Sequence, residues 1–354
     1  MSEKPILAPM VAPLLTWYQQ FARVLPWRSD PTPYHVWISE IMLQQTRVEA
    51  VKEYYARFLQ ELPDLESLAQ VPEQKLLKLW EGLGYYSRAR NLKKAAELVM
   101  EQYGGQLPSD PASLQKLPGI GAYTAGAIAS IAFQVPAPAV DGNVLRILSR
   151  VMGDYSNVSQ TQTKKKYEEL LRQVYPLAAE QKSPGDFTQA LMELGATVCV
   201  PNGEPRCLVC PWGDLCQAKK LGVIGELPVK DEKKARTIEK RTVLVLCSGN
   251  KVALRQRPKQ GLLASLWEFP AVEGHLSQQQ AKNLLNDWGM DVNGEIHSLG
   301  RAKHIFTHIE WNMIGFQAEV DCEGTESGLV WVERERLKEE YPIPNALKAY
   351  QKFL

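Results

Sequence analysis

Between Leu14 and about Leu221, apolar residues recur at the three- and four-residue spacing of amphipathic helices. Glycine and proline separate these runs, as at Gly104-Gly105, Pro108 and Pro111, where short helices end. The clearest apolar runs are Trp37, Ile38, Ile41, Met42 and Val48; Leu76, Leu77, Leu79 and Trp80; and Val144, Leu145, Leu148 and Val151. No tandem repeat is visible, so the pattern predicts an all-α domain of many short helices.

The pattern changes at Glu226, where ELPVKDEKKARTIEKR brings dense charge and few apolar residues, as in a solvated connector. Further on, apolar and polar residues alternate with a period of two, which predicts strands at 243–246, 252–257 and 311–320. Helical spacing returns near 278–288 and 344–354. We therefore predict a helical domain over residues 1–225, a charged connector over 226–240 and a smaller α+β domain over 241–354.

Composition narrows the class of protein without deciding its partner. The chain has 354 residues, 45% hydrophobic and 23% charged, and 41 basic against 40 acidic side chains give a net charge of +1. A DNA-binding surface would therefore have to be a local patch. The N-terminus has neither an apolar run of signal length nor a cleavage pattern, and no run of about 18 apolar residues occurs anywhere. We expect a cytoplasmic, nucleoid-associated protein of bacterial type, with no export signal and no membrane span.

The stretch LPGIGAYTAGAIASIAFQVPAPAVD, from Leu117 to Asp141, predicts a tight turn, a closely packed helix and a loop that ends in a carboxylate. Gly119 and Gly121 allow φ > 0 and close approach of a ligand. The N–H groups at the start of the following helix can hold an anion such as phosphate. We interpret the stretch as a binding site for the phosphate backbone of a nucleic acid, although a plain helix-turn-helix corner with a surface aspartate explains it equally well.

Two carboxyl groups are candidate catalysts. On a helix, Glu40 shares a face with Trp37 and Leu43, so desolvation would raise its pKa and suit it as a general acid. Asp141 can cap a helix that begins at Val144, where a carboxylate stays ionised and can stabilise positive charge on a sugar. The two acids would then divide the acid and the nucleophilic or electrostatic roles. The alternatives are an exposed helix-surface glutamate and an aspartate that only caps.

Four of the six cysteines lie within one short segment with the spacing C-x7-C-x2-C-x5-C: Cys199, Cys207, Cys210 and Cys216. Without an export signal, such a cluster indicates metal binding rather than disulfides. Thiolates suit zinc or a [4Fe–4S] cluster, and spacing alone does not decide between the two. We interpret the other two, Cys247 and Cys322, as buried apolar residues.

Together, these motifs resemble those of the helix-hairpin-helix base-excision DNA glycosylases. The matching segments, in the family's order, are SEIMLQQT with Glu40, GLGYYSRARNL over 82–92, LPGIGAYTAG, VDGNV and the four-cysteine loop. With its second domain included, the whole chain resembles the MutY family of adenine glycosylases. The resemblance implies a mainly α helix-hairpin-helix domain whose loop 199–216 binds one [4Fe–4S] cluster. Seven residues, Val200 to Arg206, separate the first two cysteines, where the family usually has six.

The hairpin separates this chain from endonuclease III, a member of the same superfamily. That enzyme carries a lysine two residues past the second glycine and forms a Schiff base with the sugar. This chain has Tyr123 there. The resemblance therefore implies a monofunctional glycosylase.

The resemblance also implies a role for each candidate site residue of the helical domain. Glu40 would protonate N7 of a flipped adenine, and Asp141 would stabilise the oxocarbenium-like sugar or attack it, assisted by Tyr123 and Asn143. The adenine pocket would comprise Trp27, Arg28, Leu43 and Gln189. Gly119 and Gly121 would contact DNA phosphate, and Gln45 and Tyr85 would wedge into the base stack. For Tyr85, ordinary packing is the alternative.

The second domain resembles the Nudix-fold MutT hydrolases of oxidised guanine nucleotides. A working Nudix helix needs clustered glutamates for Mg²⁺, whereas the matching stretch, Lys282 to Gly289, keeps only Asp287 as an acid. We therefore expect recognition without hydrolysis. The resemblance implies 8-oxoguanine recognition by Phe306, Thr307 and His308, with the Thr307 hydroxyl reading N7–H of the base. Read alone, HIFTHIEW is typical of an edge strand.

The leading interpretation is a monomeric enzyme that acts on double-stranded DNA and removes adenine mispaired with 8-oxoguanine or G. A glycosylase for thymine mismatches or damaged pyrimidines is the nearest alternative, because tyrosine can occupy the hairpin position there too. The second domain argues against that alternative. Glu40 and Asp141 argue against a non-catalytic iron–sulfur sensor of DNA damage.

Overall fold

A computed structural model describes residues 5–181, 183–232, 235–321 and 328–354. By contacts within the chain it divides into two compact units. The first unit takes in the chain up to residue 70 and residues 91–232, and the second takes in 71–90 and 233–354. The second unit thus includes 71–90, which the sequence pattern alone assigns to the helical domain. Cys322 and residues 233–234 of the predicted connector lie outside the described residues.

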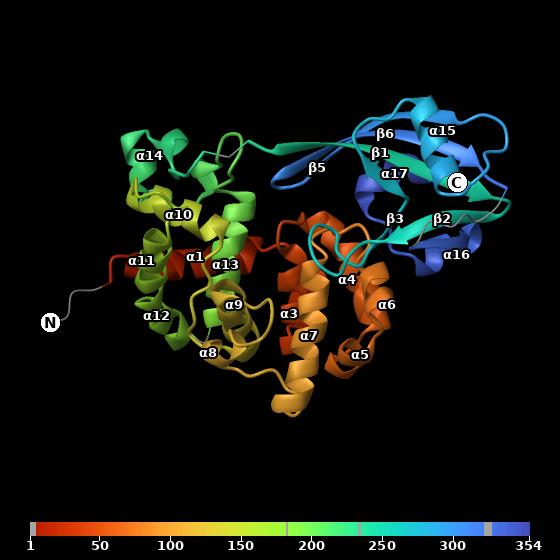
Figure 1. The fold of residues 1–354 in the computed structure, drawn as a ribbon. Coiled ribbons are helices and arrows are strands. Elements are labelled where there is room, and N and C mark those ends of the chain that lie inside the picture. The colour runs from red at the N-terminus through yellow and green to blue at the C-terminus, as the bar shows by residue number, and fades with distance from the viewer. Residues whose placement is uncertain (1–4, 182, 233–234, 322–327) are drawn as a thin grey trace. The chain divides into compact units, whose positions relative to one another are not determined.

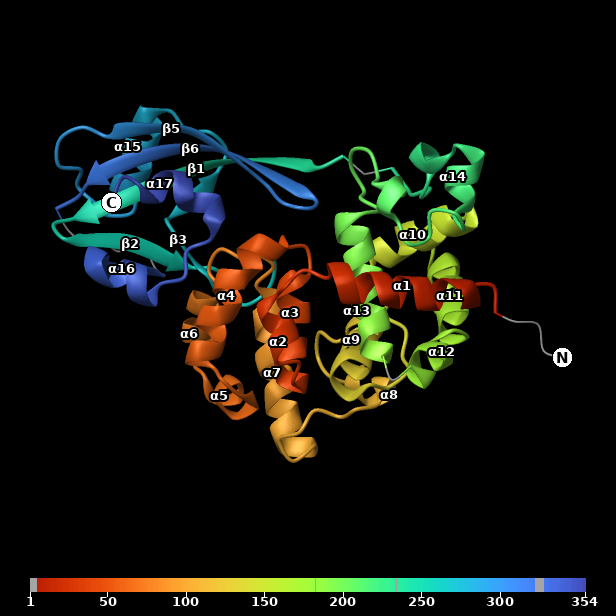
Figure 2. The same cartoon turned by 180° about the vertical axis from the view of Figure 1, so that it is seen from behind.

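The first unit is helical, as the spacing of apolar residues predicts (Figures 1 and 2). Its central helix is α13 (Pro184–Thr197), which contacts α1, α9, α10 and α12. The other helices are α1 (Ala8–Phe21), α2 (Pro26–Ser29), α3 (Pro33–Leu43), α4 (Val48–Glu61), α5 (Leu65–Gln70), α8 (Pro111–Leu114), α9 (Ala122–Phe133), α10 (Gly142–Met152), α11 (Thr161–Arg172), α12 (Tyr175–Glu180) and α14 (Gln217–Leu221), with 3₁₀ helices η1 (Cys207–Val209) and η2 (Ile224–Glu226). Helix α7 (Ser87–Gln102) has residues in both units.

Close packing explains the small residues of α9. A Cβ on Gly126 would collide with the carbonyl oxygen of Pro138, so only glycine lets α9 approach the loop that leads to Asp141. Asp141 then ends this loop as the N-cap of α10. Sequence-adjacent segments therefore bring the hairpin and the carboxylate together.

The second unit is a sheet between helices, with strand order β3-β2-β1-β6-β5; β4 pairs with β1, and β7 with β2. Strands β1 and β6 are parallel, and the other pairs are antiparallel. The strands are β1 (Thr237–Ser248), β2 (Lys251–Gln256), β3 (Trp267–Glu268), β4 (Ala271–Glu273), β5 (His297–Ile305), β6 (Ile309–Glu319) and β7 (Leu329–Glu333). The helices are α6 (Glu73–Leu79), α15 (Gln278–Asp287), α16 (Arg334–Glu340), α17 (Lys348–Gln351) and 3₁₀ helix η3 (Asn345–Leu347).

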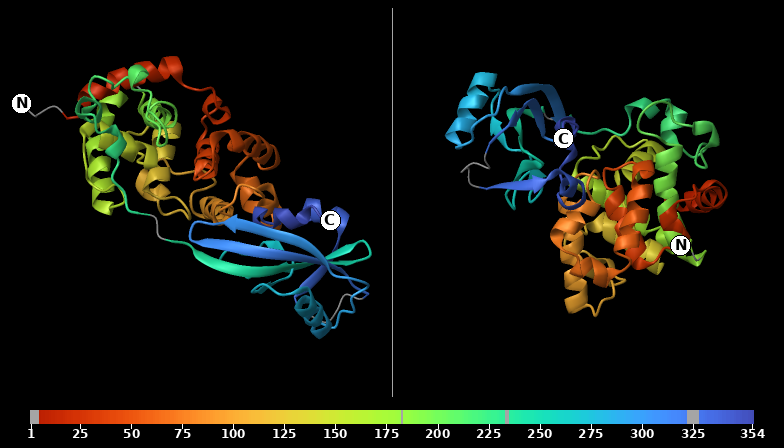
Figure 3. Two further views of the ribbon diagram at one scale, coloured as in Figure 1. Left: turned by 90° about the horizontal axis from the view of Figure 1, so that it is seen from above. Right: turned by 90° about the vertical axis from the view of Figure 1, so that its right-hand side faces the viewer.

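The sheet has an apolar core on each face. Along β1, Val243, Val245 and Cys247 belong to the core beside α16 and α17, whereas Leu244 and Leu246 belong to the core beside α15. This is the alternation that the period of two predicts. Figure 3 shows the β5–β6 hairpin lying along β1, which begins at Thr237, inside the predicted connector.

No helix within the described ranges combines the length and the apolar character needed to cross a membrane.

Candidate functional site

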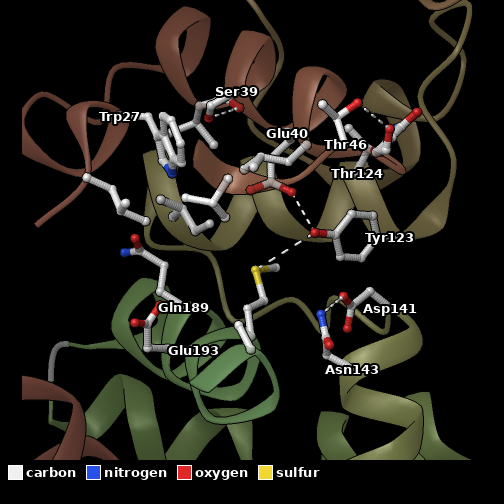
Figure 4. Close-up of a pocket in the computed structure, with 18 of the residues that line it drawn as sticks. Trp27, Ser39, Glu40, Thr46, Tyr123, Thr124, Asp141, Asn143, Gln189 and Glu193 are labelled. Carbon is white, nitrogen blue, oxygen red and sulfur yellow. Dashed lines mark hydrogen bonds between the residues drawn. The ribbon is translucent and has the colours of Figure 1, made fainter. Parts of the chain in front are cut away.

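A cavity of about 650 Å³ opens in the first unit, within the size range of small-ligand sites (Figure 4). Helices α2 and α3, the hairpin before α9, the start of α10 and one face of α13 line it. It brings together all the candidate residues of the helical domain except Tyr85 and the cysteines: Trp27, Arg28, Glu40, Leu43, Gln45, Gly119, Gly121, Tyr123, Asp141, Asn143 and Gln189.

Glu40 is almost completely buried, with 5% of its surface exposed. Burial raises the pKa of its carboxyl to about 7, and the charge of Asp141 adds to that rise, while the hydrogen bond from Tyr123 and the charge of Arg28 oppose it. The predicted burial is thus present, and the alternative of an exposed surface glutamate is wrong. A carboxyl group with this pKa is half protonated near neutral pH, as a general acid requires.

Tyr123 is the partner of Glu40. Its hydroxyl donates a hydrogen bond to Glu40 Oε2 at 2.6 Å, as Figure 4 shows, and lies 3.8 Å from Met192 Sδ. Burial raises the pKa of the phenol well above its usual value. The tyrosine is therefore a neutral donor and offers no amine to the cavity.

Asp141 caps α10 and faces the same cavity. Its Oδ1 accepts from the Val144 backbone N–H at 2.8 Å, and its Oδ2 accepts from Asn143 Nδ2 at 2.7 Å. The predicted cap is confirmed, although the helix begins at Gly142 rather than Val144. Burial raises the pKa of Asp141, against the lowering effect of these two hydrogen bonds. The helix start is therefore not the main influence on its charge, contrary to our expectation.

Glu193, the acid that binds Arg28, was not among the predicted site residues. Glu193 Oε2 accepts from Arg28 Nη2 at 2.8 Å, and Oε1 accepts from Arg23 Nε at 2.6 Å. Burial alone would raise the pKa of Glu193, but the two arginines bring it below its usual value. The sequence does hold a signal for Glu193. It follows Gln189, a predicted pocket residue, by four positions on α13, so the two share one face of the helix.

Arg146 was missed as well, and it fixes Asn143. Its Nη2 donates to Asn143 Oδ1 at 2.9 Å and to the Gly195 carbonyl at 2.9 Å, and its Nε donates to the Cys199 carbonyl at 2.9 Å. A buried arginine with these partners has little freedom. The Asn143 amide is thereby aimed at Asp141.

The hairpin glycines differ in what they require. Gly119 has φ +79°, and a Cβ there would lie 2.8 Å from Asn91 Cβ. Gly121 is the N-cap of α9 and has open space around it. The first glycine is therefore demanded by the fold, and the second leaves the helix N-terminus accessible to an anion.

The four clustered cysteines line one small cavity, together with Arg150 and Lys219. Arg150 Nη1 lies 3.4 Å from Cys199 Sγ, and Trp212 Nε1 ties the loop to the Met10 carbonyl at 2.8 Å. Between the first two cysteines the loop makes an exposed turn at Gly203, with φ +76°. Four thiols around one cavity, beside two cations, are the chemical types that suit an anionic metal–sulfur group. Among the described residues, no three His, Cys, Asp or Glu side chains form a group that could hold a metal ion.

The two predicted wedges share an unusual backbone. Gln45 has φ +58° and Tyr85 has φ +47°, and non-glycine residues in this region concentrate at functional sites. Gln45 lines the cavity of the first unit, and Tyr85 belongs to the second unit, where it lines the cavity described next. Tyr85 is 46% exposed, and its ring lies over Arg88, which donates to the Leu83 and Gly84 carbonyls.

A second cavity, of about 600 Å³, lies within the second unit and collects the other recognition residues. Phe306, Thr307 and His308 form the turn between β5 and β6, closed by a hydrogen bond of 2.8 Å from the Phe306 N–H to the Ile309 carbonyl. The segment is thus a hairpin, not a plain edge strand. The hydroxyls of Tyr85 and Thr307 are 3.1 Å apart. Asp287, the remaining acid of the Nudix stretch, ends α15 and is not among the residues that line this cavity.

Comparison with known proteins gives two family matches. Residues 38–176 match the HhH-GPD superfamily of base excision DNA repair proteins, and residues 241–352 match the NUDIX domain. An adenine DNA glycosylase of Mus musculus is 39% identical, over 84% of this chain and 68% of its own length. That of Schizosaccharomyces pombe is 31% identical, over 96% and 88%. The solved structure of a thermostable thymine-DNA glycosylase is 29% identical over 61% of this chain and 97% of its own, with a TM-score of 0.54.

Proposed function

Because this chain belongs to the adenine DNA glycosylases of the HhH-GPD base-excision repair superfamily, we propose that it removes adenine mispaired with 8-oxoguanine or guanine in duplex DNA. The observation that carries this proposal is the Glu40 carboxyl, which is buried, hydrogen-bonded to Tyr123 and poised to exchange a proton near pH 7. A cavity of about 650 Å³ around it is large enough for a flipped nucleotide.

Glu40 supplies the proton for base removal. Protonation of adenine at N7 lets the bond between C1′ and N9 break, with its electron pair leaving on the base. Tyr123 orients the carboxyl through their 2.6 Å hydrogen bond. Trp27, Leu43 and Gln189 line the space for the flipped base, and Arg28 is held there by Glu193.

Asp141 meets the positive charge that develops on the sugar. It lies at the wall of the same cavity, fixed by Val144 and by Asn143. An ionised carboxylate there stabilises an oxocarbenium-like sugar or bonds to C1′ before water completes the hydrolysis. Because Tyr123 replaces the lysine of endonuclease III, the strand stays intact and the product is an abasic site.

DNA is held by backbone contacts and by two wedges. The N-terminus of α9, opened by Gly119 and Gly121, is suited to a phosphate of the adenine strand. Gln45 and Tyr85 replace stacking lost when the base flips. In the second unit, the Thr307 hydroxyl accepts from N7–H of 8-oxoguanine, a hydrogen that guanine lacks, while Phe306 and His308 support the base and its phosphate.

Cys199, Cys207, Cys210 and Cys216 would hold one [4Fe–4S] cluster, since the four thiols line one cavity and Arg150 and Lys219 lie beside them. Bonds between the cysteine thiolates and the iron of the cluster would keep the loop 199–216 folded. One chain contains both cavities, so a monomer has every group that this proposal needs. The place of action is the chromosome, which in a bacterial-type cell lies in the cytoplasm as the nucleoid.

The test is single-turnover release of adenine from matched duplexes that carry 8-oxoguanine·A, G·A or T·A, with alkali added afterwards to cleave abasic sites. We expect strand breaks only after alkali, formed fastest with 8-oxoguanine·A. A duplex carrying a G·T mispair tests the alternative of a thymine glycosylase. Release of thymine there, with adenine retained in well-bound 8-oxoguanine·A, would overturn the proposal.

A further inference from the structure

Next to the residues of the second cavity, one aromatic ring contacts two arginines. Trp311, on β6, is 1% exposed, and the guanidinium carbons of Arg241 and Arg257 lie 4.2 Å and 5.5 Å from its ring centre. Its Nε1 donates to Glu239 Oε2 at 2.9 Å. Such cation–π contacts strengthen when the groups are desolvated. We call Trp311, Arg241 and Arg257 the tryptophan clamp.

The clamp touches one wall of the cavity through an aromatic contact. The Phe306 ring meets the Trp311 ring edge to face, with centroids 4.9 Å apart and an interplanar angle of 73°. The Phe306 ring also contacts the His304 ring, with centroids 4.7 Å apart. Phe306 is therefore the inward anchor of the turn whose next two residues, Thr307 and His308, are exposed.

The clamp also touches a second segment that lines the cavity, through a hydrogen bond of Arg257. Arg257 Nε donates to the Leu262 carbonyl at 2.9 Å, and its Nη1 pairs with Glu268 at 2.6 Å. Leu262 belongs to the segment 261–263, which lines the cavity as the turn does. One cluster around a buried tryptophan thus contacts both lining segments, although none of its three members lines the cavity.

We propose that the tryptophan clamp is a positioning element that sets the spacing of these two lining segments and so determines how selectively the base opposite adenine is read. This inference rests on the proposed role of Thr307. A hydroxyl distinguishes N7–H from a bare N7 only if it is held to within about half an ångström. The Thr307 hydroxyl has the Tyr85 hydroxyl as its hydrogen-bond partner, at 3.1 Å, and the backbone of the exposed Thr307 is placed by its neighbour Phe306 and hence by Trp311.

The experiment compares three variants of the full chain: Trp311→Leu, Trp311→Phe and Trp288→Leu. Trp288 is a matched control, because it also faces an arginine, Arg255 at 5.7 Å, but packs in the core beside α15. The readout is the ratio of single-turnover adenine release from 8-oxoguanine·A and from G·A. Hydrogen–deuterium exchange of amides 304–310 reports the order of the turn.

We expect Trp311→Leu to lower the ratio about three- to tenfold, which matches the worth of an aromatic pair, and to speed exchange in the turn. Trp311→Phe, which keeps a ring for Phe306 and the arginines, should restore most of the ratio. Trp288→Leu should leave it at the parent value. An unchanged ratio in Trp311→Leu, or an equal loss in Trp288→Leu, would overturn the proposal.

Thr307→Ala distinguishes a failure of the proposed reading role of Thr307 from a failure of the tryptophan clamp. If it lowers the ratio and folded Trp311→Leu does not, the clamp fails and the reading role stands. If Thr307→Ala keeps the parent ratio, the reading role fails and the clamp proposal fails with it. Should Trp311→Leu not fold by circular dichroism, Arg241→Gln removes one side of the clamp, and an unchanged ratio there contradicts the proposal.

Discussion

At the scale of single residues, the environment of a side chain decides its chemistry here more than its type does. Glu40 and Glu193 are both buried glutamates of one cavity. Glu193 meets two arginines and stays ionised, whereas the close partner of Glu40 is a neutral phenol, so burial dominates and its pKa rises. One acid therefore shapes the pocket and the other can deliver a proton.

The raised pKa of Glu40 predicts how activity depends on pH. The general acid must be protonated, so kcat/KM for adenine release should fall about tenfold per pH unit above pH 7. Glu40→Gln should abolish base removal at every pH while the variant still binds duplex DNA in a gel-shift assay. A pH profile that stays flat through pH 8.5 would contradict the assignment.

The same pKa predicts a dependence of stability on pH. Since the folded pKa of about 7 exceeds the ordinary 4.5, the folded state binds more protons between these values, and the free energy of unfolding falls as pH rises through this window. The loss is about 3 kcal/mol at roughly 1.4 kcal/mol per unit. Urea unfolding at pH 5 and pH 8 should show Glu40→Gln without this loss, and hence more stable than the parent at pH 8.

At the scale of elements, the site depends on how helices and turns begin. Asp141 starts α10, Gly121 starts α9, and the Phe306–His308 turn joins β5 to β6. Each places a functional group at the end of a helix or strand, where the regular element fixes the backbone conformation. A change at such a position can therefore alter either the chemistry or the element, and variants must separate the two.

For α10 the separating pair is Asp141→Asn and Asp141→Ala. Asparagine caps a helix as well as aspartate does, so Asp141→Asn should change stability little, while Asp141→Ala should cost about 1 kcal/mol. Both should slow adenine release at least about a hundredfold, because both lose the negative charge. Thermal melts and single-turnover rates measure the two effects. Full activity in Asp141→Asn would mean that Asp141 serves only as a cap.

At the scale of the whole molecule, the two units are interleaved along the chain. The segment 71–90 packs within the second unit, where Trp267 Nε1 donates to Gln74 Oε1 at 3.1 Å and Arg90 Nη1 donates to the Ala264 carbonyl at 2.7 Å. The buried Trp80 and Leu83 belong to this segment. A cut near residue 232 therefore does not separate the two units, because residues 71–90 stay with the first unit while the rest of the second unit is lost.

A chain truncated after Glu232 should consequently be less stable than the full chain. It keeps 71–90 but loses the partners of that segment, which exposes apolar surface and leaves polar groups unpaired. We expect the melting temperature of its helical transition to fall on the order of 5 °C, with some aggregation. A helical transition at the same temperature in both chains would show that 71–90 needs no partner from the second unit.

The amino-acid sequence by itself determined what depends on near neighbours. The three- to four-residue spacing predicts the helices, the period of two predicts β1, β2 and β6, and VDGNV predicts the cap at Asp141. These properties are local because dihedral preferences and side-chain periodicity act over a few residues. The apolar residues around Glu40 on one helix suggested its burial but left an exposed glutamate open, and the structure decided between the two.

Only the tertiary structure decided which distant residues meet. Glu193 lies 165 positions from Arg28, Thr307 lies 222 from Tyr85, and neither pairing leaves a periodic trace in the sequence. The same holds for the two lining segments joined at Trp311 and for the place of 71–90 in the second unit. The pKa of Asp141 also required the structure, since a cap lowers it locally while burial, set by the whole fold, raises it.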